Sequence, residues 1–176
     1  MNTIEPMRDI KKEFGQTYNQ SVDKIYRFVL IKVNSKEIAE DLTAETFTKV
    51  WRAFELSEQN QEPILNLQSF CYRTARNLVT DYYRTKGRTN LVSLEMVELA
   101  IDSEIEKEAI ISSDLEGVFK AMAGLKDEEQ DLIIWRYLDE LSIPEIAELI
   151  EKSETATRVA IHRALSSLKK VLIQND

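Results

Sequence analysis

The residues between 69 and 86 combine arginines, amides and hydroxyls in a pattern that suits binding to nucleic acid. Five of them fall on one side of a helical wheel: Arg73, Arg76, Asn77, Thr80 and Arg84. Guanidinium groups follow phosphates, and bases of a single strand stack on aromatic side chains such as Tyr83. An alternative stays open, in which the arginines pair with acids elsewhere and Tyr72 and Tyr83 join Tyr82 in the core.

A second basic face lies near the end of the chain. Its residues recur at helical spacing or flank that stripe: Thr155, Arg158, Val159, His162, Arg163, Ser166, Lys169 and Lys170. Donors and a small apolar group near a helix start can touch base edges in the major groove, while later cations neutralise phosphates. An ordinary solvated helix has the same composition, so that interpretation also stays open.

Catalytic and metal chemistry find little support. One cysteine, Cys71, and one histidine, His162, cannot build a zinc site of Cys and His ligands. The four glycines stand too far apart to form a phosphate-binding loop. Asp41 and Glu45 lie one helical turn apart, but a solvated face or a protein contact explains them better than a metal. We therefore predict no catalytic residue, metal or cofactor, and no enzymatic activity.

Helical periodicity dominates the chain, so the elements that carry these faces indicate an all-α protein. The predicted helices cover about residues 17–34, 36–54, 69–86 and 127–138, with another around Val118 and Met122. An amide-rich stretch with Pro63, residues 57–68, is predicted to be a loop.

The clearest local signal is near the C-terminal end. Ser142 and Glu145 have the spacing of a capping box, and Pro144 is tolerated in a first turn. Ser153 is then expected to cap a second, longer amphipathic helix. Two helices separated by a short turn predict a helix-turn-helix.

Charge divides the chain into parts. The total is −8, from 31 acids and 23 bases, which at face value opposes nucleic-acid binding. Residues 69–90 nevertheless hold five bases and one acid, whereas residues 91–116 hold eight acids and one base. We expect two small helical domains, 1–90 and 114–176, joined by an acidic linker, 91–113. Because nonspecific affinity rests on phosphate neutralisation, DNA binding should be local and weak in the free chain.

The acids of residues 127–151 suggest a further hypothesis. They number nine against one arginine, and they lie next to the second basic face. Acidic segments of this kind could screen the basic faces until a partner separates the two domains. Apolar runs do not exceed four residues and the N-terminus lacks a secretory signal, so we predict a cytoplasmic protein without membrane insertion.

Three stretches, in this order, resemble the extracytoplasmic-function (ECF) group of bacterial RNA polymerase sigma factors over nearly the full length. They are AEDLTAETFTKVW (39–51), FCYRTARNLVTDYYR (70–84) and SIPEIAELIEKSETATRVAIHRALSSLKK (142–170). The resemblance implies a region-2 bundle and a region-4 helix-turn-helix. It also implies that the chain binds core RNA polymerase, directs it to promoters and helps to open the −10 element.

The resemblance also assigns roles to residues. Asp41, Leu42, Glu45 and Phe47 would bind the β′ clamp helices, and the polymerase β subunit would be a further contact. The first basic face, with Tyr83, would hold the −10 strand, and the 57–68 loop would capture a flipped base at a cost of a few kcal/mol. The second face would read the −35 element. An anti-sigma factor is an expected partner.

The chain departs from the family pattern at several positions. Ala44 stands where glutamine is common, and Glu151-Lys152 stand where a glycine and an apolar residue are common in the turn. Because glycine accepts positive φ without strain, this turn should be either differently shaped or mildly strained. With few cations at the start of the last helix, we predict weaker or unusual −35 affinity. Competing hypotheses are a helix-turn-helix regulator that acts without polymerase, an all-α enzyme and a pure interaction module.

Overall fold

The computed structural model describes residues 9–60, 62–86 and 113–175, and within these ranges the chain is helical without a strand, which confirms the all-α prediction. The elements are α1 (Ile10–Val33), α2 (Lys36–Gln59), α3 (Leu67–Lys86), α6 (Ser113–Ala123), α7 (Asp127–Ile133), the π-helix η1 (Ile134–Leu138), α8 (Ile143–Leu149) and α9 (Glu154–Asn175). No helix in the described part of the chain is both long enough and apolar enough to span a bilayer. The predicted acidic linker, 91–113, lies outside the described residues except for its last one.

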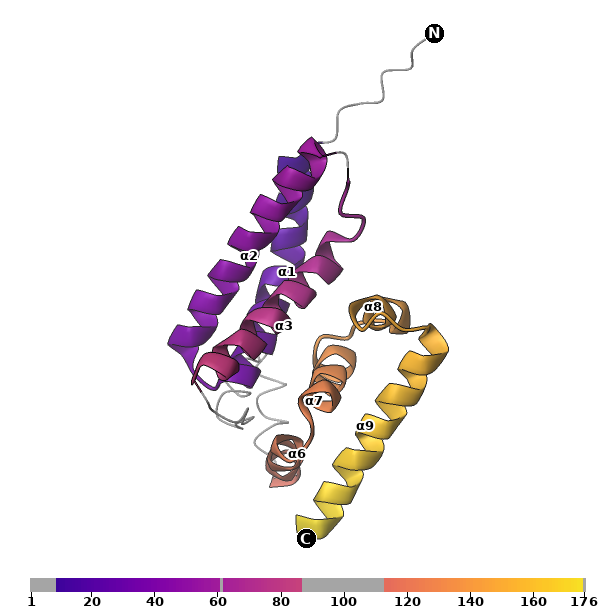
Figure 1. Ribbon diagram of the computed structural model, residues 1–176. Helices are drawn as coiled ribbons and strands as arrows, with labels where there is room; N and C mark the ends of the chain where they lie inside the picture. The colour runs from indigo at the N-terminus through magenta and orange to yellow at the C-terminus, as the bar shows by residue number, and fades with distance from the viewer. Residues whose placement is uncertain (1–8, 61, 87–112, 176) are drawn as a thin grey trace.

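Helices α1, α2 and α3 pack together as one bundle (Figure 1). Their apolar stripes meet in a core in which Ile25, Phe28 and Phe54 are fully buried. Helix α1 begins at residue 10 rather than the predicted 17, with the Asp9 side chain accepting a hydrogen bond from the backbone N–H of Lys12 at 3.1 Å. An aromatic side chain that lies outside the predicted apolar stripe stabilises these additional turns of α1.

That side chain is Phe14, whose ring lies 5.0 Å from the ring of Trp51 and 6.5 Å from that of Phe47. Burying an aromatic pair of this kind adds packing energy that helical propensity alone does not supply. Helix α2 also continues five residues beyond the predicted end, so the loop before α3 is shorter than predicted. The side chain of Asn66 accepts a hydrogen bond from the N–H of Ser69 at 3.0 Å and starts α3.

The second group of helices contains the predicted helix-turn-helix. The capping box is confirmed: the N–H of Ser142 donates to Oε2 of Glu145 at 2.7 Å, and the N–H of Glu145 donates to Oγ of Ser142 at 3.4 Å. Oγ of Ser153 accepts from the N–H of Ala156 at 3.2 Å, as predicted for the next helix start. Helices α8 and α9 follow one another as the prediction requires.

The turn between α8 and α9 contains a residue in a strained backbone conformation. Glu151 has φ 54°, in the left-handed region that favours glycine. A second residue in this region, Glu140, has φ 56° and follows the π-helix. Of the two alternatives that the sequence left open for this turn, the positive φ of Glu151 favours the strained one.

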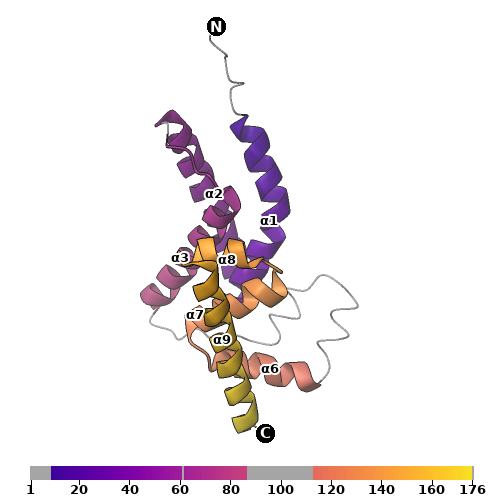
Figure 2. The same cartoon turned by 90° about the vertical axis from the view of Figure 1, so that its right-hand side faces the viewer.

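The two groups of helices pack against each other. Helix α3 contacts α8, and the turn that follows η1 reaches α1 (Figure 2). The indole of Trp135 stacks on Phe28 of α1, with ring centroids 5.8 Å apart, and meets Tyr72 of α3 edge-on at 6.3 Å. One continuous apolar core thus extends from α1 through η1 to α9.

Candidate nucleic-acid interface

The five polar residues predicted to share a face of α3 do so, but they differ in accessibility. Asn77, Thr80 and Arg84 are exposed, whereas Arg73 and Arg76 are half-buried. The hydroxyl of Thr80 donates to the backbone oxygen of Arg76 at 2.9 Å, and Arg84 pairs with Asp81 of its own helix at 3.0 Å. We call these five residues the α3 face.

Both half-buried arginines of the α3 face pair with acids of the second helical group. Nε of Arg76 donates to Oδ2 of Asp131 at 2.8 Å. Arg73 places Nη1 3.2 Å from Oε1 of Glu151, and its Nη2 donates to the backbone oxygen of Glu148 at 3.4 Å. At these two positions the structure therefore favours the alternative in which the arginines pair with acids elsewhere.

The three tyrosines of α3 take different places. Tyr72 is buried and its hydroxyl donates to Oδ2 of Asp139 at 3.1 Å. The hydroxyl of Tyr83 donates to the backbone oxygen of Lys32 in α1. Tyr82 is half-buried and its ring contacts that of Tyr83 edge-on, at 5.2 Å. Tyr83, predicted to contact DNA, is thus half-buried with its hydroxyl directed at α1.

The predicted major-groove face on α9 is open to solvent. Seven of its eight residues are exposed and the eighth, Ser166, is half-buried with its hydroxyl donating to the backbone oxygen of His162 at 2.9 Å. Arg158 pairs with Glu154 one turn earlier at 2.8 Å. Exposed i,i+4 pairs contribute only a few tenths of a kcal/mol, so Arg158 can exchange Glu154 for a phosphate at little cost.

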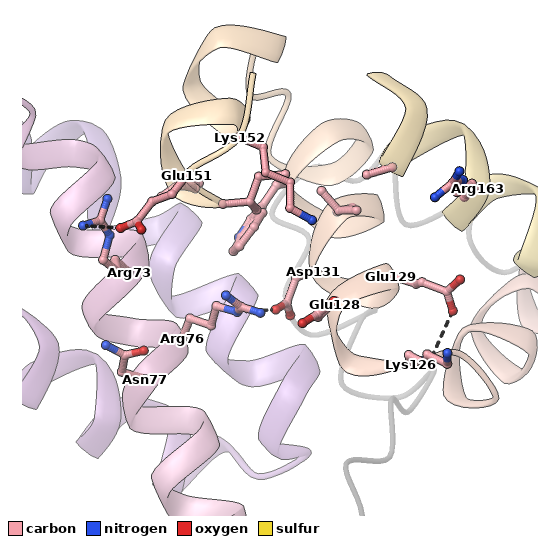
Figure 3. A pocket seen from close by; sticks show the side chains of 15 residues that line it. Arg73, Arg76, Asn77, Lys126, Glu128, Glu129, Asp131, Glu151, Lys152 and Arg163 are labelled. Atoms are coloured by element: carbon pink, nitrogen blue, oxygen red, sulfur yellow. Dashed lines mark hydrogen bonds and ion pairs between the residues drawn. The ribbon is translucent and has the colours of Figure 1, made fainter. Parts of the chain in front are cut away.

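A pocket of about 520 Å³ lies between the α3 face and the second helical group (Figure 3). Its wall joins residues from both predicted DNA-binding faces: Arg73, Arg76 and Asn77 from α3 and Arg163 from α9. The remaining charged residues of the wall are Lys126, Glu128, Glu129, Asp131, Glu151 and Lys152. Because its wall combines five basic side chains with four acidic ones, this space has no strong preference for a free anion.

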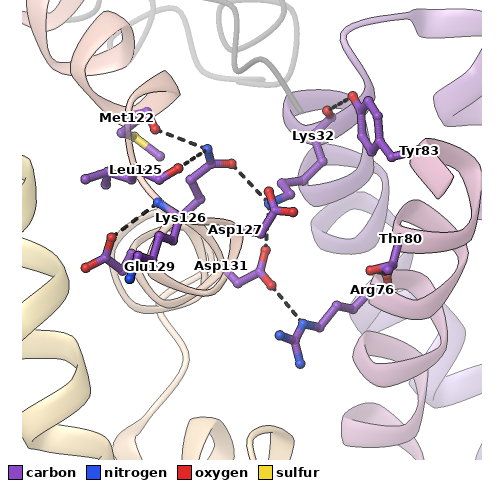
Figure 4. A network of polar contacts seen from close by, with 11 residues as sticks. Lys32, Arg76, Thr80, Tyr83, Met122, Leu125, Lys126, Asp127, Glu129 and Asp131 are labelled. Carbon is purple, nitrogen blue, oxygen red and sulfur yellow. Dashed lines mark hydrogen bonds and ion pairs between the residues drawn. The ribbon is translucent and has the colours of Figure 1, made fainter. Parts of the chain in front are cut away.

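The buried polar groups of this boundary form two clusters. In the first, Nζ of Lys32, whose residue is 2 % exposed, lies 3.0 Å from Oδ1 of Asp131 and donates to Oε1 of Gln130 at 3.1 Å (Figure 4). Oδ1 of Asp127 is 3.4 Å away. The amide of Gln130 in turn donates to the backbone oxygens of Met122 and Leu125, at 3.2 Å each.

In the second cluster the fully buried carboxylate of Asp139 receives two hydrogen bonds from Arg27, at 3.0 and 2.8 Å. Nζ of Lys24 donates to the Asp139 backbone oxygen at 3.0 Å. Desolvation by burial nevertheless raises the pKa of Asp139 to about 6, because the loss of hydration outweighs the favourable charge of Arg27. Burial beside the same carboxylate also raises the pKa of Tyr72.

The residues predicted to bind polymerase lie on α2. Asp41 and Glu45 are exposed, Leu42 is half-buried and Phe47 is buried. Glu45 pairs with Lys49 at 3.1 Å. Among the described residues, no three or more histidine, cysteine, aspartate or glutamate side chains come together in a group that could hold a metal ion. A groove beside them, between α1 and α2, is lined by aromatic rings from Phe14, Tyr18, Tyr26, Phe47 and Trp51.

Sequence reasoning did not single out the residues that join the two groups of helices. Asp131 and Trp135 lie in the predicted helix 127–138 and Asp139 follows it, in a segment that was noted for its acids as a group. That acidity was a usable signal, since it raised the hypothesis that acids screen the basic faces. It could not identify which acid meets which arginine.

Comparison with known proteins places both halves of the chain in one family. Residues 17–89 match the family model "Sigma-70 region 2", and residues 115–168 match "Sigma-70, region 4". The chain is 30 % identical over 146 residues to the ECF RNA polymerase sigma factor ShbA of Streptomyces griseus, covering 80 % of this chain and 75 % of ShbA.

Two further similarities agree with this one. The chain is 28 % identical over 162 residues to the ECF RNA polymerase sigma factor BldN of Streptomyces coelicolor, covering 90 % of this chain but only 60 % of BldN. Among solved structures, CnrH in complex with the cytosolic domain of CnrY matches with a TM-score of 0.62 at 18 % identity. That match covers 94 % of this chain and 91 % of CnrH and concerns the fold.

Proposed function

This chain belongs to the ECF group of RNA polymerase sigma factors, and we propose that it binds core RNA polymerase, directs it to particular promoters and helps to open the −10 region. The observation that carries the proposal is the presence of two basic helical faces, one in each matched region of a single chain. Polymerase supplies the catalysis, so the chain itself needs no catalytic residue and acts where polymerase acts, in the cytoplasm.

The proposed polymerase contact is the exposed side of α2. Asp41 and Glu45 offer carboxylates to the β′ clamp helices, and Leu42 adds a half-buried apolar side chain. The buried Phe47 packs in the core of the bundle behind this surface. The aromatic groove between α1 and α2 continues this surface with apolar area. A further contact with the β subunit is part of the same proposal.

The proposed DNA contacts divide between the two groups of helices. The α3 face with Tyr83 holds the −10 strand, and the loop before α3 captures a flipped base. Unstacking that base costs a few kcal/mol, which its binding to the loop must offset. The α9 face enters the major groove at −35, with Thr155, Val159 and His162 near base edges and Lys169 and Lys170 near phosphates. Domain limits at 1–90 and 114–176 fit this division and stay a prediction.

An anti-sigma factor is the proposed inhibitory partner. CnrH, which shares this fold, was solved with the cytosolic domain of CnrY bound, and the exposed α2 surface and its aromatic groove are available for such a contact here.

The test is run-off transcription with purified core polymerase and a random promoter library. Promoter-dependent transcripts that require the chain support the proposal, and enrichment should reveal shared −10 and −35 sequences. A helix-turn-helix regulator acting alone predicts instead promoter binding without polymerase and no transcripts. Failure to co-purify with core polymerase would contradict the proposal.

Single substitutions test the residue assignments. Arg84→Ala removes an exposed cation of the α3 face and should lower transcription about tenfold, since hydrogen bonds to charged groups contribute about 1.5–3 kcal/mol. Lys11→Ala removes an exposed cation of α1 that belongs to neither proposed DNA-binding face and serves as the control. Equal losses in the two variants would show that general charge, not the α3 face, matters.

A further inference from the structure

The pocket between α3 and the second helical group has an apolar part as well as a charged one. Leu132, Trp135 and Leu149 line it and are almost completely buried. Ile150 and Ala160, both half-buried, belong to the same lining. Its volume of about 520 Å³ lies within the range of about 300–1,000 Å³ that is typical of sites for small organic molecules. The pocket can therefore accommodate a molecule with an apolar body.

The charged part of the wall keeps a small positive excess. Of its five basic and four acidic side chains, the two arginine–carboxylate pairs that join α3 to the second helical group account for two of each. The remaining cations are Lys126, Lys152 and Arg163, and the remaining acids are Glu128 and Glu129. Glu129 already accepts two hydrogen bonds, one on each carboxylate oxygen. The side chains of Lys152 and Arg163, in contrast, have no hydrogen-bond or ion-pair partner in the described part of the chain.

The two unpaired cations reach the pocket from different elements (Figure 3). Lys152 belongs to the turn between α8 and α9, whereas Arg163 lies on α9. Both are exposed, so each is hydrated and attracts a bare anion only weakly. An anion that also removes apolar surface from water gains further affinity from the buried lining beside them. The pocket therefore suits an acid group that is attached to an apolar body.

We propose that this pocket is a binding site for a small amphipathic organic anion, whose apolar body packs against Leu132, Trp135 and Leu149 and whose acid group pairs with Lys152 and Arg163. The inference goes beyond the proposed function and does not depend on it, because it uses only the pocket and its charges. Since the wall comes from both groups of helices, a bound molecule contacts both at once and stabilises the folded chain by mass action.

Anilinonaphthalene sulfonate is a suitable probe, because it joins an aromatic body to one sulfonate and its fluorescence rises when it leaves water. The measurement is a fluorescence titration of this probe with the full-length chain, without DNA or polymerase. Inorganic phosphate, added as a competitor, tests whether a bare anion is enough. The aromatic groove between α1 and α2 is a second apolar surface, so variants must show which site the probe occupies.

Three variants locate the probe. Lys152→Glu reverses an exposed charge of the pocket wall and should weaken binding about fivefold, since exposed ion pairs are individually weak. Ala160→Phe places a ring in the apolar lining and should weaken binding about tenfold or more, because the ring takes the space of the apolar body. Lys11→Glu is the matched control: it makes the same charge change at an exposed residue of α1 outside the wall and should leave the affinity unchanged.

Thermal melting checks that each variant is folded, and the probe should raise the melting temperature of wild type because it binds the folded chain. Equal probe affinity in wild type and Lys152→Glu would overturn the proposal, and so would an equal loss in Lys11→Glu. Displacement of the probe by inorganic phosphate, or a fall in the melting temperature, would overturn it as well. Because Lys152 is exposed, its variant keeps the test decisive even if Ala160→Phe fails to fold. The assay contains neither polymerase nor DNA, so its failure leaves the proposed function untouched.

Discussion

Replacing Asp139 with asparagine should remove a pH dependence of stability that the wild-type protein shows between pH 7 and pH 4. The carboxylate is fully buried and burial raises its pKa to about 6, whereas its ordinary value is 3.8. The folded protein therefore binds this proton at a higher pH than the unfolded chain does. Proton uptake by the folded state means that the contribution of Asp139 to stability increases as the pH falls through 6 and levels off near 4.

The magnitude follows from the two pKa values. Between pH 7 and pH 4.5, linkage gives a gain of about 2 kcal/mol in the free energy of unfolding from this group alone. The charged groups around it are Arg27 and Lys24 of α1, and Glu145 of α8 lies close enough to influence Tyr72.

The assay is urea denaturation followed by circular dichroism at pH 4.5, 5.5 and 7 for wild type and Asp139→Asn. Subtracting the two curves cancels Glu145 and every other carboxylate that both proteins retain. The difference should move by about 2 kcal/mol in favour of wild type as the pH falls. Parallel curves, or a difference that favours wild type more at higher pH, would refute the reasoning about burial.

Four other substitutions have expected outcomes in the same denaturation assay. Glu140→Gly should stabilise the chain by about 0.5–1 kcal/mol, because it removes a glutamate from the left-handed backbone region. Asn34→Gly, at φ 54°, should increase the free energy of unfolding by less, since asparagine tolerates this region. Equal increases in the two variants would contradict that explanation. Trp135→Ala should cost about 3–5 kcal/mol, and a loss below 1 kcal/mol would show that the indole is not a packing anchor. Ser142→Ala should cost about 1 kcal/mol through loss of the capping box, and no change would refute the cap.

Local features of the fold could be predicted because they depend on residues close in sequence. The capping box at Ser142 and the strained turn at Glu151 each follow from a few neighbouring residues and their backbone requirements. The polar and apolar sides of α3 follow from helical period alone. The start of α1 was predicted seven residues too late, because the stabilising partners of Phe14 lie in α2.

The pairing of the two halves could not be predicted in the same way. Arg76 and Asp131 are 55 positions apart, and Arg27 and Asp139 are 112 apart. Composition indicated that acids could screen the basic faces, but nine acids in one segment offer too many partners for two arginines. Similarly, the π-helix η1 has no clear signature in its sequence, although it carries Trp135 and leads directly to Asp139.

The packing of Trp135 has an optical consequence. An indole enclosed by Phe28 and Tyr72 emits at shorter wavelength than one in water, so opening of the boundary should shift its emission to the red. The chain contains two tryptophans, and Trp51→Phe would leave Trp135 as the single emitter. The protein thus carries its own spectroscopic reporter of the packing between its two groups of helices.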